Sequence, residues 1–66
     1  MNRVPINLVN RIREEFEEAP DLRLNPSEAA RFWALDLMTC EEILTRLLEV
    51  GFLAKGEDHR YRPVSV

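Results

Sequence analysis

The chain has 66 residues, with nine lysines and arginines against twelve aspartates and glutamates, a net charge of -3 and a sequence pI near 5.0. This length allows one domain with one small core, because short chains bury a smaller fraction of their surface than long ones. Domains that bind nucleic acid tightly and without sequence preference are usually basic, so the acidic balance argues against that class. Dimerisation would supply buried surface that so short a chain lacks.

Cysteine usage and hydropathy predict where the protein resides. Cys40 is the only cysteine, so no internal disulfide can form and no oxidising compartment is indicated. Residues 1–7 lack the uninterrupted apolar core of a signal peptide. No apolar run approaches the ~20 residues that a membrane span needs. We therefore expect a soluble, cytoplasmic protein with no membrane partner.

A first helix is predicted over about residues 5–18. Its apolar residues recur at helical spacing, with polar residues between them: Leu8, Val9, Ile12 and Phe16. The first helical residue stays open, because Pro5 suits the first turn whereas Asn7 could act as the cap. Arg11 and Arg13 each precede a glutamate by four residues, so each can form an ion pair one turn on.

A second helix is predicted over about residues 26–34. Residues 22–24 alternate apolar and polar and predict one brief strand or an extended link before it. Asn25 can cap the helix, Pro26 suits its first position, and Glu28 stands three residues after the cap. This arrangement is a capping box, in which each of two side chains accepts a hydrogen bond from the other residue's backbone amide.

A third helix is predicted over about residues 37–50. Asp36 is a natural cap, and Gly51 can take the left-handed conformation that ends a helix. The apolar stripe of this helix consists of Cys40, Ile43, Leu44, Leu47 and Leu48. We expect Cys40 to be a small core hydrophobe on that stripe and Trp33 to be a core anchor.

A β-hairpin is predicted over about residues 52–64, with a turn at residues 56–59. An isolated two-stranded hairpin is unstable, so we expect Leu53 and Tyr61 to pack against the helices. The predicted fold class is therefore mostly α with a small β-hairpin (α+β), in a single domain over residues 1–66.

Helix, short strand, helix, turn, helix and hairpin, in that order, resemble the winged helix-turn-helix superfamily over essentially the whole chain. Small Ala30 stands where such proteins bring two helices close, Leu35 and Cys40 match the apolar positions that lock the turn, and Asp36 matches the cap. Ala34 departs from the pattern, because glycine is common there in a left-handed conformation. Alanine in that conformation costs about 1 kcal/mol, so we expect a looser variant of the turn.

The resemblance implies that the third helix is a recognition helix, which lies in the major groove of double-stranded DNA. The positions implied are Leu37, Met38, Glu41, Glu42 and Thr45. The two-stranded wing would track the phosphate backbone with Lys55, His59, Arg60 and Arg62, and Arg31 and Arg46 would flank it. Glutamate can accept a hydrogen bond from cytosine, but two adjacent glutamates are unfavourable beside phosphates.

Two functions stay open from the sequence. The first is a DNA-binding or transcription-associated protein with weak or cooperative DNA contact through the third helix and the wing. The second is a protein-interaction module in which the acidic and apolar face of the third helix binds a protein partner or a second copy. The structural alternative is that Glu41, Glu42 and Glu49 are a solvated helix face and that Leu37 and Met38 cover the gap between the second and third helices. The wing cations would then balance Glu57 and Asp58.

Catalysis is the least favoured class. One cysteine and one histidine, Cys40 and His59, do not have metal-ligand spacing, and no phosphate loop or activated nucleophile is present. The adjacent glutamates at residues 14–15 and 17–18 lie on a helix predicted to be exposed and without a cleft, so we do not expect them to form a general acid–base pair. We expect no enzyme activity, cofactor, metal or small-molecule substrate.

Overall fold

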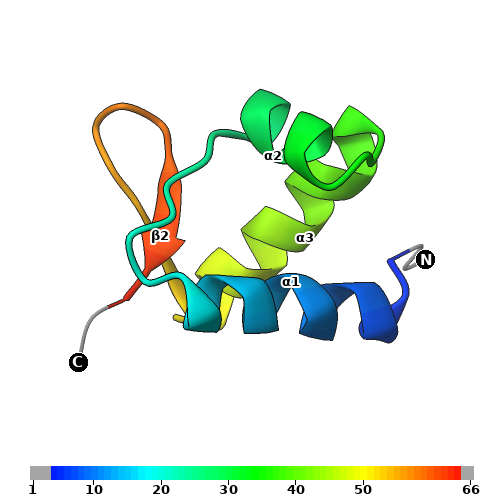
Figure 1. Ribbon diagram of the computed structural model, residues 1–66, viewed down its shortest axis with the longest axis horizontal. Helices are drawn as coiled ribbons and strands as arrows, with labels where there is room; N and C mark the ends of the chain where they lie inside the picture. Colours follow the sequence, from blue (N-terminus) through cyan, green and yellow to red (C-terminus); the bar gives the residue numbers. More distant parts are fainter. Residues whose placement is uncertain (1–3, 65–66) are drawn as a thin grey trace.

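A computed structural model of the chain describes residues 4–64. Three helices and two strands follow in order: α1 (Ile6–Glu18), α2 (Pro26–Phe32), α3 (Leu37–Glu49), β1 (Leu53–Lys55) and β2 (Tyr61–Pro63) (Figure 1). The predicted α+β layout of three helices and an antiparallel hairpin is confirmed. Residues 1–3 of the amino-terminal segment and residues 65–66 of the predicted domain lie outside the described residues.

Helix α1 begins at Ile6, and Pro5 precedes it as the N-cap residue without a side-chain cap. The two predicted ion pairs along α1 are present, Arg11–Glu15 at 3.6 Å and Arg13–Glu17 at 3.7 Å. Pairs of this kind are exposed and contribute little to stability.

The predicted capping box at the start of α2 is confirmed. The Asn25 Oδ1 atom accepts a hydrogen bond from the Glu28 amide at 2.7 Å, and the Glu28 Oε1 atom accepts one from the Asn25 amide at 3.0 Å. Pro26 occupies the first turn. Helix α2 is nevertheless two residues shorter than the predicted span to residue 34, because its last turn closes at Phe32.

The turn between α2 and α3 corrects one expectation. Ala34 has φ 56°, so this alanine adopts the left-handed conformation and the expected looser turn is wrong. The Leu35 amide donates to the Ala30 carbonyl at 2.8 Å and the Ala34 amide donates to Arg31 at 3.4 Å. These bonds are those of a Schellman motif, in which the helix-ending residue must be left-handed. Half-buried Leu35 packs against the core and stabilises the same geometry.

Helix α3 has defined ends. Asp36 accepts hydrogen bonds from the Thr39 amide at 3.0 Å and from the Thr39 hydroxyl at 2.7 Å. These two bonds, led by that of the hydroxyl, hold the pKa of Asp36 below its ordinary value. Gly51, with φ 83°, ends the helix, and the Phe52 amide donates to the Leu47 carbonyl at 2.9 Å. The predicted cap and stop residues are therefore confirmed.

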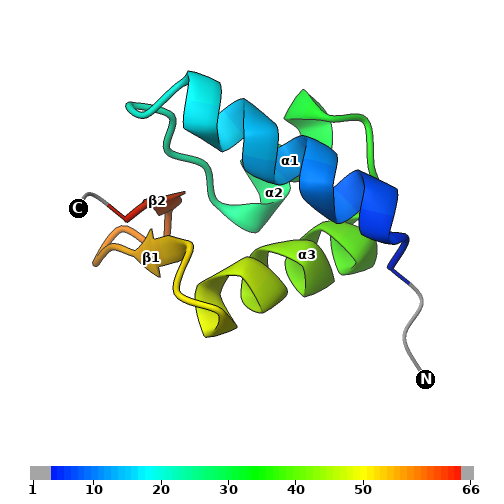
Figure 2. The same ribbon diagram turned by 90° about the horizontal axis from the view of Figure 1, so that it is seen from below.

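The core lies between the three helices, and the hairpin closes it at the carboxyl end of α3 (Figure 2). Its largest fully buried side chains are Phe16, Ile12, Ile43, Leu44, Leu53 and Cys40. Leu53 and Tyr61 are buried, as predicted for the hairpin. Trp33 is half-buried at the core edge, where its ring meets Phe16 edge-on at 5.6 Å and its Nε1 donates to Glu15 at 2.8 Å.

The hairpin pairs Leu53 with Pro63 and Lys55 with Tyr61 in antiparallel register. Leu24 forms an isolated antiparallel bridge with Tyr61, so the predicted brief strand before α2 is reduced to a single bridged residue. Its amide donates to the Tyr61 carbonyl at 3.2 Å, and the Tyr61 amide donates back at 2.8 Å. Among residues 4–64, no helix has the length and apolar character required to cross a bilayer.

Candidate interaction surface on helix α3

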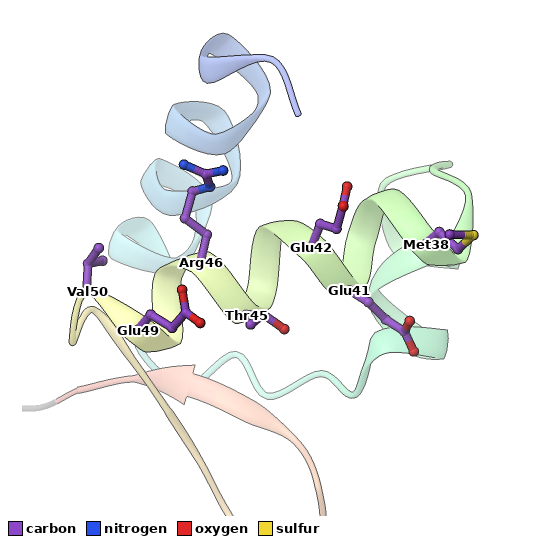
Figure 3. A pocket seen from close by; sticks show the side chains of 7 residues that line it. All are labelled: Met38, Glu41, Glu42, Thr45, Arg46, Glu49 and Val50. Atoms are coloured by element: carbon purple, nitrogen blue, oxygen red, sulfur yellow. The ribbon is translucent and has the colours of Figure 1, made fainter. Parts of the chain in front are cut away.

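Helix α3 turns one side to the core and the other to solvent. Its buried side consists of Cys40, Ile43, Leu44 and Leu47. Seven residues of the opposite side line one open depression, which we call the α3 face: Met38, Glu41, Glu42, Thr45, Arg46, Glu49 and Val50 (Figure 3). The helical repeat places these residues along one side over the whole length of the helix.

The α3 face contains five of the predicted contact residues: Met38, Glu41, Glu42, Thr45 and Arg46. Leu37, also predicted, is 46% exposed at the first turn of α3 but does not line the depression. Sequence reasoning left both Val50 and Glu49 out of the predicted contact set. Val50 stands twelve residues after Met38, and this multiple of four was the signal that could have identified it.

The charges of the α3 face are three carboxylates, from Glu41, Glu42 and Glu49, and the guanidinium of Arg46. None of these four groups takes part in an ion pair within 4 Å among the residues that the structure describes. The face is therefore acidic, and its charges are available to another molecule.

Large apolar side chains stand at both ends of this acidic surface. Met38 is 74% exposed at the first turn of α3, and Val50 is 72% exposed just after the last. The α3 face therefore has one large exposed apolar side chain at each end. The surface combines what a protein interface needs, namely apolar contacts and charges that select the partner.

A second groove lies between α1 and the carboxyl end of α3 and continues the α3 face. Arg46 and Val50 line both hollows, and Ile6, Arg13 and Phe52 belong to the second one. The Arg13 guanidinium lies 5.3 Å from the centre of the Phe52 ring, and Ile6 is strongly exposed. The surface is thus acidic near the start of α3 and basic and apolar beside α1.

The cations predicted for the wing lie on the hairpin, away from the depression. Arg60 donates to both carboxylate oxygens of Glu28, from Nε at 3.0 Å and from Nη2 at 2.8 Å. The Arg60 side chain holds the pKa of Glu28 below its ordinary value, and Glu28 in turn raises the pKa of Arg60. The Lys55 ammonium lies 5.7 Å from the centre of the Tyr61 ring. His59 and Arg62 are exposed.

Several other groups define what the site can do chemically. Burial raises the pKa of the Cys40 thiol to about 11, so the thiolate that would act as a nucleophile is scarce at neutral pH. Within residues 4–64, no three His, Cys, Asp or Glu side chains gather where they could hold a metal ion. Phe32 projects beside α2, with its ring 5.3 Å from that of Trp33, and is 57% exposed.

Comparisons with family models, with curated proteins and with solved structures find no match for this chain.

Proposed function

We propose that this chain is a protein-interaction module on a winged-helix scaffold and that it binds its partner through the α3 face. The observation that carries this proposal is the composition of that face: three glutamates that form no ion pair within residues 4–64, beside one arginine, between exposed Met38 and exposed Val50. An acidic surface with apolar ends has the chemistry of a protein contact and lacks that of a phosphate contact.

The scaffold part of the proposal rests on the order and contacts of the elements. Helices α2 and α3 meet at a tight turn, the hairpin follows α3, and Leu24 bridges to Tyr61 beside it. These features agree with the sequence resemblance to the winged helix-turn-helix superfamily. In that arrangement α3 is the helix presented to another molecule.

DNA binding is the second candidate, favoured by exposed Lys55, His59 and Arg62 on a hairpin next to α3. Two features weigh against it. Glu41 and Glu42 at the start of α3 would approach the phosphates and repel them, which removes the charge attraction that supplies most nonspecific affinity. Arg60 is held by Glu28, so a phosphate would have to displace a bidentate ion pair.

The α3 face also indicates the chemistry of the partner. Three negative charges against one positive charge favour a partner surface that places lysine or arginine opposite the glutamates, since complementary charge steers association. Met38 and Val50 favour apolar side chains at the ends of the contact. An amphipathic helix with basic residues around an apolar stripe has this combination.

An NMR titration tests the proposal with two probes, a synthetic amphipathic helix of leucine and lysine and a random duplex DNA, the latter at low and moderate salt. We expect the peptide to shift the amide resonances of Met38, Glu42 and Glu49. The pair of changes Glu41→Lys and Glu42→Lys should weaken peptide binding by about tenfold or more, because two attractive charges become repulsive. The double variant Glu18→Lys with Glu57→Lys makes the same charge change away from the α3 face and should leave peptide binding unaltered.

Two results would contradict the proposal. The first is a peptide that does not bind, or that binds equally well to both charge variants. The second is tight duplex binding that shifts α3 resonances and falls steeply with salt, since that slope reports phosphate contacts and would establish the DNA alternative.

A further inference from the structure

We infer that the partner of the α3 face is a second copy of this chain, which pairs with the first through a stripe formed by Met38, Glu42, Arg46 and Val50. This inference rests on the proposed function and names its partner. In the pair, the two stripes lie side by side in opposite directions about a two-fold axis. Met38 of each copy meets Val50 of the other, and Glu42 meets Arg46.

The four residues form a single ridge of α3. Each follows the one before it by four positions, and residues four apart are neighbours on a helix surface. Figure 3 shows Glu42, Arg46 and Val50 projecting along one edge of the α3 face and Glu41 and Thr45 along its other edge, with Met38 at the start of the helix. Ridges of this type from two helices interdigitate in the commonest class of helix packing, with an interaxial angle of about -50°.

The chemical order along the ridge is apolar, acidic, basic, apolar. A two-fold axis brings residue i of one copy to residue j of the other and j to i, so an interface of this kind must be complementary to its own reverse. The ridge meets that condition, because its apolar ends and its opposite charges share one midpoint at residue 44. A parallel arrangement would instead place like charges together.

All four side chains are available for this contact. Met38 and Val50 are 74% and 72% exposed. Glu42 and Arg46 are spaced for an ion pair within their own helix, yet none forms within 4 Å among the described residues. Both charges can therefore pair with another molecule.

The surroundings of the ridge support the antiparallel direction. Glu41 adds negative charge near the start of α3, and the groove beside its end contains apolar Ile6 and the guanidinium of Arg13, which is also 3.7 Å from the Glu17 carboxylate. Opposite directions bring the acidic end of one copy to the basic end of the other. Glu49 at the basic end reduces this complementarity, and one ridge is smaller than the roughly 800 Å² per partner of a standard interface. The pair is therefore a weak, reversible dimer.

Sedimentation velocity over a concentration series from about 10 μM to about 1 mM tests the inference, since this range brackets weak association. We expect the wild-type protein to shift from monomer to dimer. Glu42→Arg alone and Arg46→Glu alone should each remain monomeric, because each places like charges opposite one another at both contacts. An equimolar mixture of the two variants should associate, since every facing pair is then opposite in charge. The double variant should also dimerise by itself.

Controls separate this result from unfolding and from net charge. Glu18→Arg changes the charge as Glu42→Arg does, but it lies on α1 away from the ridge and should leave dimerisation intact. Circular dichroism melts should show that both single variants are folded.

The inference is overturned by a wild-type chain that stays monomeric, by single variants that dimerise normally, or by a mixture that fails to associate. A monomeric chain that still binds the leucine-lysine peptide on α3 would overturn the inference and leave the proposed function standing. A monomeric chain that binds no peptide would overturn both.

Discussion

Ala34 shows how a single residue can take a conformation that its side chain opposes. Its φ of 56° brings the Cβ close to its own carbonyl oxygen, which costs about 1 kcal/mol relative to glycine. The hydrogen bond from Leu35 to Ala30 and the Asp36 cap of α3 both require this turn. The surrounding contacts therefore offset the strain of a left-handed alanine. From the sequence alone we expected a looser turn that avoids this strain.

Replacing Ala34 with glycine should stabilise the protein by about 0.5–1 kcal/mol, because the strain is removed and the lost methyl group is exposed. For a domain of this size the melting temperature should rise by roughly 2–8 °C. Thermal unfolding followed by circular dichroism measures the change. Ala19→Gly is the matched control, since exposed Ala19 has a negative φ and its replacement should give no gain. A melting temperature for Ala34→Gly at or below the wild-type value would contradict the strain assigned here.

At the level of elements, Glu28 joins the start of α2 to the hairpin. Its carboxylate accepts from the Asn25 amide and from two nitrogens of Arg60, so one side chain completes a cap and anchors residue 60. The Leu24–Tyr61 bridge connects the same two parts of the chain. The hairpin therefore has a fixed position relative to α2, although it contains only two short strands.

The change Arg60→Met should loosen the hairpin while the helices stay folded, because it removes both contacts to Glu28 and keeps an unbranched side chain. We expect faster amide hydrogen exchange at Gly56 and Tyr61, by about tenfold, with little change at Ile43. Exchange measured by NMR provides residue-level rates. Arg62→Met is the control, since it removes a cation of the same hairpin that forms no ion pair in the described part of the chain. Equal protection at Gly56 in both variants would rule out the anchoring role of Arg60.

Local signals predicted the elements well, and long-range partners less well. The caps formed by Asn25, Glu28 and Asp36 could be predicted because each side chain bonds to a backbone amide only three residues away in the chain. The Arg60–Glu28 pair spans 32 residues, and nothing in the spacing of exposed charges indicates which two will meet. For the same reason Arg60 was assigned to a DNA-tracking wing. The turn at Ala34 was missed because local propensity was outweighed by the contacts on either side of it.

The α3 face was predicted in part. Helical periodicity separated the outward residues from the core stripe, so Glu41 and Glu42 were expected on the outward side of the third helix, and both are exposed. The groove beside α1 was not foreseen, because it requires Ile6 and Phe52 to be brought together by the fold. Whether the α3 face binds a protein or DNA depends on which of its charges lack an ion-pair partner within the chain. Such pairs are set by the folded structure, so the sequence alone does not show them.

For the whole molecule, the lowered pKa of Glu28 makes stability depend on pH. Arg60 favours the charged Glu28 carboxylate in the folded state, so the folded state binds fewer protons at this group than the unfolded state does. The resulting stabilisation is present above the ordinary pKa of about 4.5 and is lost as the pH falls below it. Asp36, whose pKa is also lowered, acts in the same direction.

Urea unfolding at pH 7, 5 and 3 should therefore show stability falling mainly between pH 5 and pH 3. Glu28→Gln should be less stable than wild type at pH 7, because the ion pair is gone, and it should lose less on acidification. Glu57→Gln removes a carboxylate that forms no ion pair within residues 4–64, so it is the appropriate control. An unchanged pH dependence in Glu28→Gln would show that the Arg60 contact does not contribute to acid sensitivity.

Trp33, the only tryptophan, makes the molecule convenient to study by fluorescence. Its indole lies between Phe16, Phe32 and the Glu15 carboxylate, on α1 and α2 and not on the α3 face. Separation of these two helices exposes the ring to water and shifts its emission to longer wavelength. Docking at α3 does not touch the ring. Intrinsic fluorescence emission thus reports whether each variant is folded, independently of whether that variant has bound a partner.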